Sequence, residues 1–153
     1  ILLYKLGVFP NEKPKQKLFS HFFKKMKEEK FNEICRKYSL ERIDNILRKS
    51  TLEKIKWHKK SGHKLIIISA STDRWIKPWA EKEGFSDIIC TDVEVKEGLI
   101  TGSLKGKNCY GREKAERFLK RYPERNEYYL YAYGDSRGDR ELLKIADKGE
   151  LVR

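Results

Sequence analysis

The spacing of apolar residues divides the chain into a helical first part and a mixed second part. Up to residue 61 the apolar positions recur every three or four residues, which is the period of an amphipathic helix. Residues 18–29 show this most clearly, with lysines opposite an apolar stripe of Leu18, Phe22, Phe23 and Met26. The same period predicts helices over residues 31–38, 40–48 and 52–60, the last one capped by Ser50 or Thr51.

The pattern changes after Ser61. Residues 65–70 form a continuous β-branched apolar run, which is typical of a strand buried on both faces of a parallel sheet. The elements predicted after it are a helix over 72–82, a strand over 86–90, an alternating hairpin over 91–104, a helix over 110–122, a buried strand over 127–133, a helix over 139–146 and a strand starting near 151. This order predicts an α/β fold with a doubly wound parallel sheet.

Charge separates the same two parts. A chain of 153 residues fits one domain, and its net charge is +12. Residues 1–64 contain 18 Lys and Arg against 7 Asp and Glu, whereas residues 65–153 contain 17 against 16. The basic surplus therefore belongs to the helical part, and we expect the two parts to have different roles.

The spacing of the cysteines indicates the redox compartment of the protein, and the hydropathy shows whether a segment could span a membrane. Cys35, Cys90 and Cys109 are far apart and form no CxxC motif, so we expect free thiols in a reducing, cytoplasmic compartment and no zinc site. The best apolar run, residues 65–70, is the length of a strand and too short to span a membrane.

Polar residues that could form a site follow the predicted strands. Ligands bind at the carboxyl ends of the strands of an open parallel sheet. The loops expected at that edge carry Ser69, Ala70 and Ser71, then Lys114, then Asp135 and Asp139. Carboxylates hold Mg²⁺, and hydroxyl, backbone N–H and ammonium groups bind phosphate oxygens, so together these residues predict a magnesium-phosphate site.

Each of these motifs alone also fits a structural role. The GDxxxD string can be a turn with a helix N-cap, the SAS string a capped turn, and Lys114 a solvated side chain. Their order along one βα pattern favours the site. We expect Trp75 and Trp79 to be packing residues and Cys109 to be a buried thiol, and we assign no function to His58 or His63.

The motif strings resemble those of a known family. KLIIISAS, the lysine in GREKAERF, and GDSRGDREL resemble the second, third and fourth motifs of the haloacid dehalogenase superfamily of hydrolases. The longer pattern from SGHKLIIISAS to YAYGDSRGDRELL is similar to its phosphoserine phosphatase-like branch, and within that branch to the group that includes phosphatidylglycerophosphatase C. The similarity covers about residues 50–147, and the first 50 residues match the helical cap of the branch loosely.

The resemblance implies a Rossmann-like core with a small helical cap, and a division of roles in the site. Ser69, with Ala70 and Ser71, would bind the phosphoryl group, and Lys114 would stabilise its charge. Asp135 would bind Mg²⁺, and Asp139 would support the metal directly or through water. The family also uses an aspartate nucleophile that forms an aspartyl-phosphate and a second aspartate as general acid and base, both in a DxD motif on its first strand.

This sequence contains no DxD motif, and before Ser61 its one aspartate is Asp44. In the family the first strand lies in the middle of the sheet, between the Ser69 strand and the Asp135 strand. We therefore expect residues 1–50 to form a basic cap and residues 51–153 to form a core without its first strand. A preceding segment of roughly 30–40 residues would supply that strand, and this sequence alone should not hydrolyse phosphate esters.

The sequence leaves three alternative hypotheses for the function. The first is a Mg²⁺-dependent phosphomonoester phosphatase that acts on a phosphorylated small molecule or phospholipid, such as phosphatidylglycerophosphate. Its basic cap would attract anionic substrates or contact an anionic membrane surface at the inner membrane face, although the lysines can equally be solvated helix faces. The second is a phosphatase of phosphoserine or another small metabolite. The third is a non-catalytic basic binding module; no nucleic acid-binding motif is present.

Overall fold

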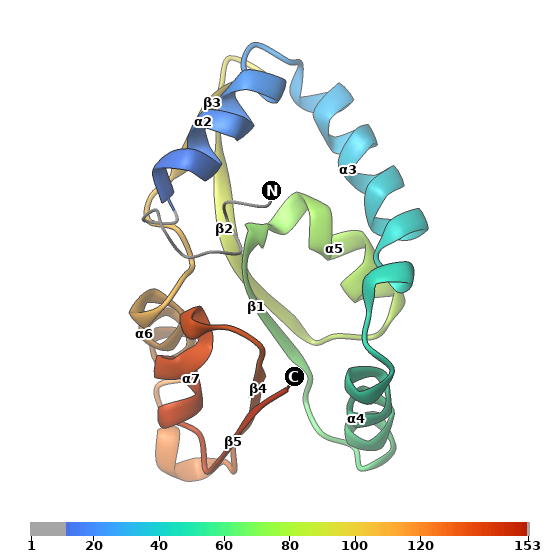
Figure 1. The fold of residues 1–153 in the computed structure, drawn as a ribbon, viewed down its shortest axis with the longest axis vertical. Coiled ribbons are helices and arrows are strands. Elements are labelled where there is room, and N and C mark those ends of the chain that lie inside the picture. Colours follow the sequence, from blue (N-terminus) through green and yellow to red (C-terminus); the bar gives the residue numbers. More distant parts are fainter. Residues whose placement is uncertain (1–11, 153) are drawn as a thin grey trace.

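The computed structural model describes residues 12–152, and its helices and strands are labelled in Figure 1. The helices are α2 (Glu12–Phe23), α3 (Glu28–Arg42), α4 (Lys49–Lys60), α5 (Asp73–Lys82), α6 (Arg112–Arg121) and α7 (Arg140–Lys144). The strands are β1 (Ile66–Thr72), β2 (Asp87–Lys96), β3 (Leu99–Lys105), β4 (Tyr131–Gly134) and β5 (Lys148–Leu151). Short 3₁₀ turns cover Asp44–Ile46, Arg125–Glu127 and Arg137–Asp139.

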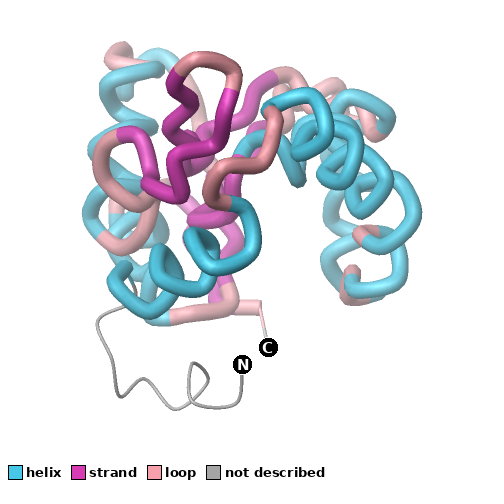
Figure 2. Tube along the Cα trace, turned by 90° about the horizontal axis from the view of Figure 1, so that it is seen from above, coloured by secondary structure: helices cyan, strands magenta, loops and turns pink. Residues whose placement is uncertain are grey.

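The strands form two small sheets. β1 pairs in parallel with β2, and β2 continues into an antiparallel hairpin with β3. β4 pairs in parallel with β5. Seen from above, helices lie on both sides of the strands (Figure 2). This arrangement confirms the predicted α/β class, and the hairpin is confirmed with its turn at Glu97 and Gly98, which both have positive φ.

A cavity separates the two sheets. Among the described residues, β1 pairs only with β2, and β4 pairs only with β5. The cavity between β1 and β4 has a volume of about 800 Å³, and apolar side chains from both strands line it, including Ile66, Ile68 and Ala132. The unpaired edges of two parallel-type strands therefore face the same apolar space.

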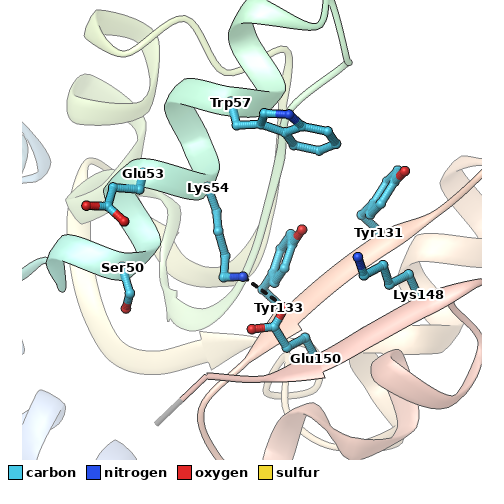
Figure 3. Close-up of a pocket in the computed structure, with 8 residues that line it drawn as sticks. All are labelled: Ser50, Glu53, Lys54, Trp57, Tyr131, Tyr133, Lys148 and Glu150. Carbon is cyan, nitrogen blue, oxygen red and sulfur yellow. Dashed lines mark hydrogen bonds and ion pairs between the residues drawn. The ribbon is translucent and has the colours of Figure 1, made fainter.

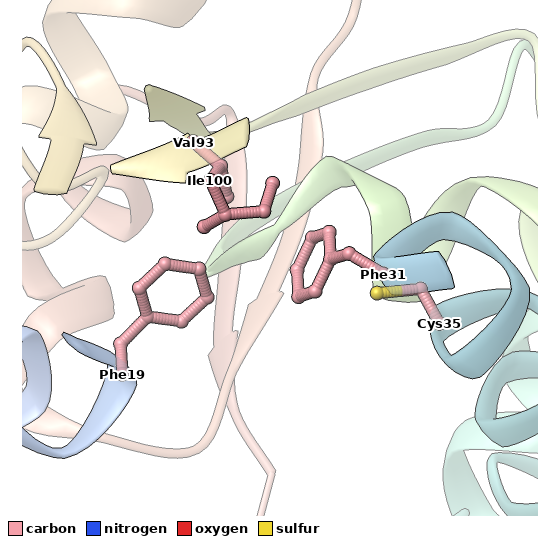
Figure 4. Packing of buried hydrophobic residues seen from close by; sticks show 5 residues of the cluster. All are labelled: Phe19, Phe31, Cys35, Val93 and Ile100. Carbon is pink, nitrogen blue, oxygen red and sulfur yellow. The ribbon is translucent and has the colours of Figure 1, made fainter. Parts of the chain in front are cut away.

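The first helices pack on the hairpin. Phe19 of α2 and Phe31 and Cys35 of α3 form a buried cluster with Val93 and Ile100 of the hairpin (Figure 4). The Phe19 and Phe31 rings meet edge to face, with their centroids 5.7 Å apart. This cluster fixes the orientation of α2 relative to the strands.

The predicted apolar stripe of α2 is wrong in part. Leu18 and Phe22 are 54% and 61% exposed, whereas Phe19 is 5% exposed. Phe23 packs against the buried cluster as predicted, and Met26 also packs there but lies outside the helix, which ends at Phe23 and not at residue 29. The helix presents the Phe19–Phe23 pair to the hairpin instead of the Leu18–Phe22 pair, because both pairs have the same four-residue spacing and the position of the hairpin selects one of them.

Several element boundaries also differ from the prediction. β4 begins at Tyr131 because the preceding residues form the Arg125–Glu127 turn, which the Arg125 guanidinium ties to the carbonyls of Tyr128 and Ile145. Ser50 and Thr51 lie inside the first turn of α4, and Arg48 takes the N-cap position. The strand expected near residue 151 exists but covers Lys148–Leu151.

The two tryptophans of α5 pack as expected. Trp79 is 4% exposed and belongs to a cluster with Ile43 and Ala80, and Trp75 lies against the Phe19 cluster. Within residues 12–152, none of the helices combines the length and apolar character that crossing a membrane requires.

Candidate functional site

Hydrogen bonds hold the second half of β1, where the structure places Ser69, Ala70 and Ser71 inside the strand and not in the loop expected after it. The backbone N–H of Ser71 donates to Ser69 Oγ at 3.1 Å. On the neighbouring strand, the hydroxyl of the buried residue Thr91 lies 2.9 Å from the carbonyl oxygen of Ala70 and 3.0 Å from Asn108 Oδ1. This network connects the Ser69–Ser71 part of β1 to the turn that precedes α6.

Lys114 connects this part of β1 to the acidic loop, residues 135–139, which follows β4. It lies in the first turn of α6 and is 8% exposed, although lysine is rarely buried. Its ammonium donates to the carbonyl oxygen of Ile68, next to Ser69, at 3.2 Å and to Asp139 Oδ1 at 2.5 Å. The structure thus brings Lys114 and Asp139 into direct contact beside Ile68 of β1.

Asp139 organises the acidic loop. Its second carboxylate oxygen accepts hydrogen bonds from the backbone N–H of Asp135 at 3.1 Å, and from the N–H and hydroxyl of Ser136 at 3.0 and 2.7 Å. Ser136 and Asp139 form a capping box, so the helix-capping interpretation of this string holds for Asp139. Burial alone would raise the pKa of Asp139, but the hydrogen bonds from Lys114 and Ser136 lower it below the ordinary value.

The Asp135 side chain has a different environment from that of Asp139. It is 60% exposed, and its carboxylate lies 3.3 Å from the Arg48 guanidinium. Arg48 also donates to the carbonyl of Val152 at 2.9 Å. Sequence reasoning missed Arg48, because one arginine among 35 basic residues gives no local signal.

Close packing shapes the acidic loop. A Cβ on Gly134 would lie 2.3 Å from the Cβ of Asp139, and a Cβ on Gly138 would lie 2.3 Å from the ring of Tyr110. Glycine at these two positions lets Asp139 fold back under the end of β4 and lets the loop lie against the turn before α6. The glycines that flank the acids are therefore part of the geometry of the site.

Asp135 is the better metal ligand of the two aspartates. Both oxygens of Asp139 already accept hydrogen bonds from Lys114 and Ser136, whereas the Asp135 carboxylate is open to solvent. The part of the chain that the structure describes holds no group of three or more His, Cys, Asp or Glu suited to a metal. Mg²⁺ often binds through one or two carboxylates, with water and substrate phosphate completing its shell, so these residues fit Mg²⁺ with Asp135 as the direct ligand.

Lys15 is a second residue that sequence reasoning missed. It lies in the first turn of α2, and its ammonium contacts the carbonyl oxygen of Ala70 and lies 3.1 Å from Asn108 Oδ1. These partners are 55 and 93 residues away along the chain, and a lysine in a lysine-rich helix carries no signal of such a contact.

Two cavities lie beside β4. Asp139 lines the cavity between β1 and β4. A second pocket, of about 410 Å³, lies between α4 and the β4–β5 sheet, where Lys54 and Glu150 form a 2.9 Å ion pair beside Trp57 (Figure 3). The residues that line this second pocket include none of the predicted site residues.

The thiols near the site are buried. Cys109 is 0% exposed, as predicted for a packing residue, and burial raises its pKa. Burial likewise raises the pKa of Cys90 to about 12. A protonated thiol is a poor nucleophile, so neither cysteine suits covalent catalysis.

Comparison with known proteins places the chain among hydrolases. The sequence pattern of the haloacid dehalogenase-like hydrolases matches residues 1–144. Protein CicA of Caulobacter vibrioides is 37% identical over 93 residues, which cover 60% of this chain and 41% of CicA. A Mycobacterium tuberculosis protein named as a probable phosphatase is 30% identical over 98 residues, which cover 62% of this chain and 33% of that protein. The matches span less than half the length of these two relatives.

A solved structure shows the same fold. The phospho-aspartyl intermediate analogue of a phosphoserine phosphatase aligns with a TM-score of 0.65 and 22% identity, covering 92% of this chain and 64% of that one. The observed architecture is therefore the Rossmann-like α/β fold that the motif strings implied.

Proposed function

The chain belongs to the haloacid dehalogenase-like hydrolase family, and on that premise we propose that it is part of a Mg²⁺-dependent phosphomonoester phosphatase. The proposal depends on one observation. The buried ammonium of Lys114 contacts both Ile68 of β1, the residue before Ser69, and Asp139 of the acidic loop. An ammonium and a carboxylate therefore lie together between two parallel-type strands, and we propose that the Ser69 hydroxyl and the exposed Asp135 carboxylate complete the site, since α/β proteins bind ligands at the carboxyl ends of such strands.

The proposed chemistry assigns one task to each group. The Ser69 hydroxyl and the Lys114 ammonium bind phosphoryl oxygens, and Lys114 stabilises the charge that builds on them in the transition state. Asp135 holds Mg²⁺, which when bound neutralises phosphoryl charge. Asp139 keeps Lys114 and the backbone of Asp135 in place and is a positioning residue.

The nucleophile is proposed to come from a strand outside this sequence. An aspartate carboxylate there would displace the alcohol from phosphorus, and water would then release phosphate from the aspartyl-phosphate. Within residues 12–152 the facing edges of β1 and β4 pair with no other strand, and an extended strand in the apolar cavity between them would pair with both edges. Such a strand would end beside Lys114 and the acidic loop. This supports a core that spans residues 51–153 and one further strand.

The substrate class is proposed from charge. The surplus of basic residues over 1–64 favours anionic substrates, and phosphatidylglycerophosphate-type lipids at an anionic membrane surface fit it. Phosphoserine is the alternative, which the fold shared with a phosphoserine phosphatase favours. A non-catalytic basic module would not require a buried lysine and an acidic loop at the ends of two strands.

The test is phosphate release by the complete protein. Phosphatidylglycerophosphate, phosphoserine and p-nitrophenyl phosphate would be offered with Mg²⁺ or with EDTA. We expect Mg²⁺-dependent turnover, and a fall of about 100-fold or more in Asp135→Asn, since metal charge stabilisation is worth several kcal/mol. Glu141→Gln is the matched control, because Glu141 lies near the same loop but pairs with Lys144 at the surface.

The outcomes separate the alternatives. Turnover that Asp135→Asn leaves intact would refute the metal assignment. The absence of turnover on all three esters, in a protein that contains an upstream DxD motif, would refute the phosphatase. A complete protein without such a motif would favour the binding module.

A further inference from the structure

We propose that Arg48, the residue that precedes helix α4, uses two nitrogens of its guanidinium to position the Asp135 carboxylate for Mg²⁺. The inference rests on the proposed phosphatase function and deepens it, because it adds a residue outside the sequence motifs to the metal site. Arg48 would touch neither the metal nor the substrate. It would act through Asp135 and is therefore a positioning residue.

The Arg48 guanidinium bridges two acceptors at the end of the β4–β5 sheet. Its Nη2 donates to Asp135 Oδ2 at 3.3 Å, and its Nη1 donates to the carbonyl oxygen of Val152 at 2.9 Å. Asp135 directly follows β4 and Val152 directly follows β5, so one side chain joins the ends of two paired strands. Within residues 12–152, the other oxygen of Asp135, Oδ1, accepts no hydrogen bond and is open to a metal.

The backbone closes this contact into a ring. The N–H of Val152 donates to the carbonyl oxygen of Gly134 at 2.7 Å, and Gly134 directly precedes Asp135. The residue that binds the guanidinium is therefore bonded to the backbone beside the carboxylate that the guanidinium contacts. Val152 is 8% exposed and follows a paired strand, so its carbonyl is a fixed anchor. The guanidinium is thus held independently of Asp135, and it can restrict the rotation of the carboxylate.

Holding one oxygen of an exposed carboxylate favours metal binding at the other. A free side chain loses rotamer freedom when it binds a metal, and a side chain that is already ordered loses less. Metal-ligating carboxylates are accordingly hydrogen-bonded by outer residues, whose loss weakens metal binding by roughly 10- to 100-fold. The guanidinium also repels Mg²⁺, but the Arg48 and Asp135 side chains are 47% and 60% exposed, and water and salt screen charges at such exposure. We therefore expect orientation to outweigh repulsion.

The two acceptors require an arginine and not simply a positive charge. A guanidinium presents its N–H donors in a rigid planar fork, so two nitrogens can bind two acceptors in one geometry, whereas a lysine ammonium is a point charge on a flexible stem. Arg48→Lys therefore keeps the charge and removes the fork, which separates the two contributions.

The test measures the binding of Mg²⁺ alone to the complete protein, by isothermal titration calorimetry at physiological ionic strength. We expect Arg48→Ala and Arg48→Lys each to weaken Mg²⁺ binding about 10-fold, at the lower end of the effect of outer residues. Lys49→Ala is the matched control, because it removes a positive charge from the next residue, which is exposed. It should change the Mg²⁺ affinity less than about 2-fold, as expected for a screened surface charge.

Phosphate release by the same variants distinguishes positioning from damage to the fold. A positioning role should raise the Mg²⁺ concentration at half-maximal activity about 10-fold in Arg48→Lys, while kcat at saturating Mg²⁺ stays within about 2-fold of the wild type. A merely structural role would lower kcat at every Mg²⁺ concentration without moving that midpoint, and would overturn the proposal. Thermal unfolding in EDTA checks that each variant is folded.

The titrations decide the proposal in each case. Unchanged Mg²⁺ affinity in Arg48→Ala would overturn it, and so would tighter binding, which would make Arg48 a competitor of the metal. Wild-type affinity in Arg48→Lys would show that the fork is not needed, and equal weakening in Arg48→Ala and Lys49→Ala would assign the effect to the start of α4 in general; either result overturns it. Asp135→Asn, titrated beside these variants, separates the two proposals. If Asp135→Asn binds Mg²⁺ like the wild type, the metal assignment of the proposed function has failed, whereas loss of binding in Asp135→Asn alone means that only the Arg48 proposal has failed.

Discussion

Lys114 and Asp139 form an ion pair of 2.5 Å whose side chains are 10% and 8% exposed, and because Lys114 also contacts Ile68, the pair joins β1 to the loop after β4. Lys114 lies in the first turn of α6 and Asp139 in the 3₁₀ turn Arg137–Asp139, 25 positions further along the chain. The pair therefore bears on both the stability and the chemistry of the site.

Removing one partner should destabilise the fold strongly. Lys114→Met or Asp139→Leu leaves an uncompensated buried charge, and we expect each to lower the free energy of unfolding by about 3–5 kcal/mol. The double variant should lose much less than the sum, because no lone charge remains. Urea unfolding of the four proteins in a double-mutant cycle measures this coupling.

A surface pair provides the control for this cycle. Lys144 and Glu141 lie 2.8 Å apart on α7, but their side chains are 67% and 44% exposed. Water and salt screen such a pair, so Lys144→Ala should cost less than about 1 kcal/mol. Additive losses at Lys114 and Asp139 would contradict the proposed coupling.

Acid should weaken the same pair. The pKa of Asp139 in the folded protein is below the ordinary 3.8, because the hydrogen bonds from Lys114 and Ser136 outweigh the effect of burial. A lowered pKa in the fold means that its stabilising contribution is complete above the ordinary pKa and is lost as the pH falls through the folded pKa. The wild type should thus lose stability below pH 3.8, and Asp139→Asn should lose less over that range. Unfolding measured between pH 6 and the acid limit of folding tests this; parallel curves would contradict it.

The sequence predicted the parts of the site that depend on strand order. The βα pattern alone predicts that Ser69 and Lys114 lie at one edge of the sheet, and in the structure Lys114 contacts Ile68, the residue before Ser69. The sequence pattern did not distinguish the roles of Asp135 and Asp139, because both follow the same predicted strand. The structure separates them, since Gly134 lets Asp139 turn back beneath the strand while Asp135 faces solvent.

Contacts between distant segments escaped prediction. Leu18 and Phe19 are equally apolar, and only the position of the hairpin decides that Phe19 is buried and Leu18 is exposed. The contact of Lys15 with Ala70 depends in turn on that choice of face. Helical period shows that a face exists, but the tertiary partner determines which residues occupy it.

The turn of Asp139 leads to a prediction at Gly134. Gly134→Ala places a methyl group 2.3 Å from the Cβ of Asp139, so one of the two must move. We expect a loss of about 1–3 kcal/mol in stability, as for other overpacked sites, together with loss of Mg²⁺-dependent activity. Gly106→Ala is the comparison, because its methyl meets open space and only the φ of +76° is strained. Equal stability and activity in both variants would show that Gly134 does not control the position of Asp139.

His58 should make the fold sensitive to mild acid. It is 6% exposed, its Nδ1 lies 2.8 Å from Nδ1 of His63, and its Nε2 lies 3.0 Å from the Tyr133 hydroxyl. Burial, and then the charges of His63 and Lys54, lower the pKa of His58 below the ordinary 6.5. The unfolded chain therefore binds a proton more readily, so stability should fall as the pH drops below about 6.5. His58→Gln should flatten this slope in urea unfolding between pH 7.5 and 5.5, and the exposed His21→Gln should not; if the two variants share the wild-type slope, the buried imidazole is not the cause.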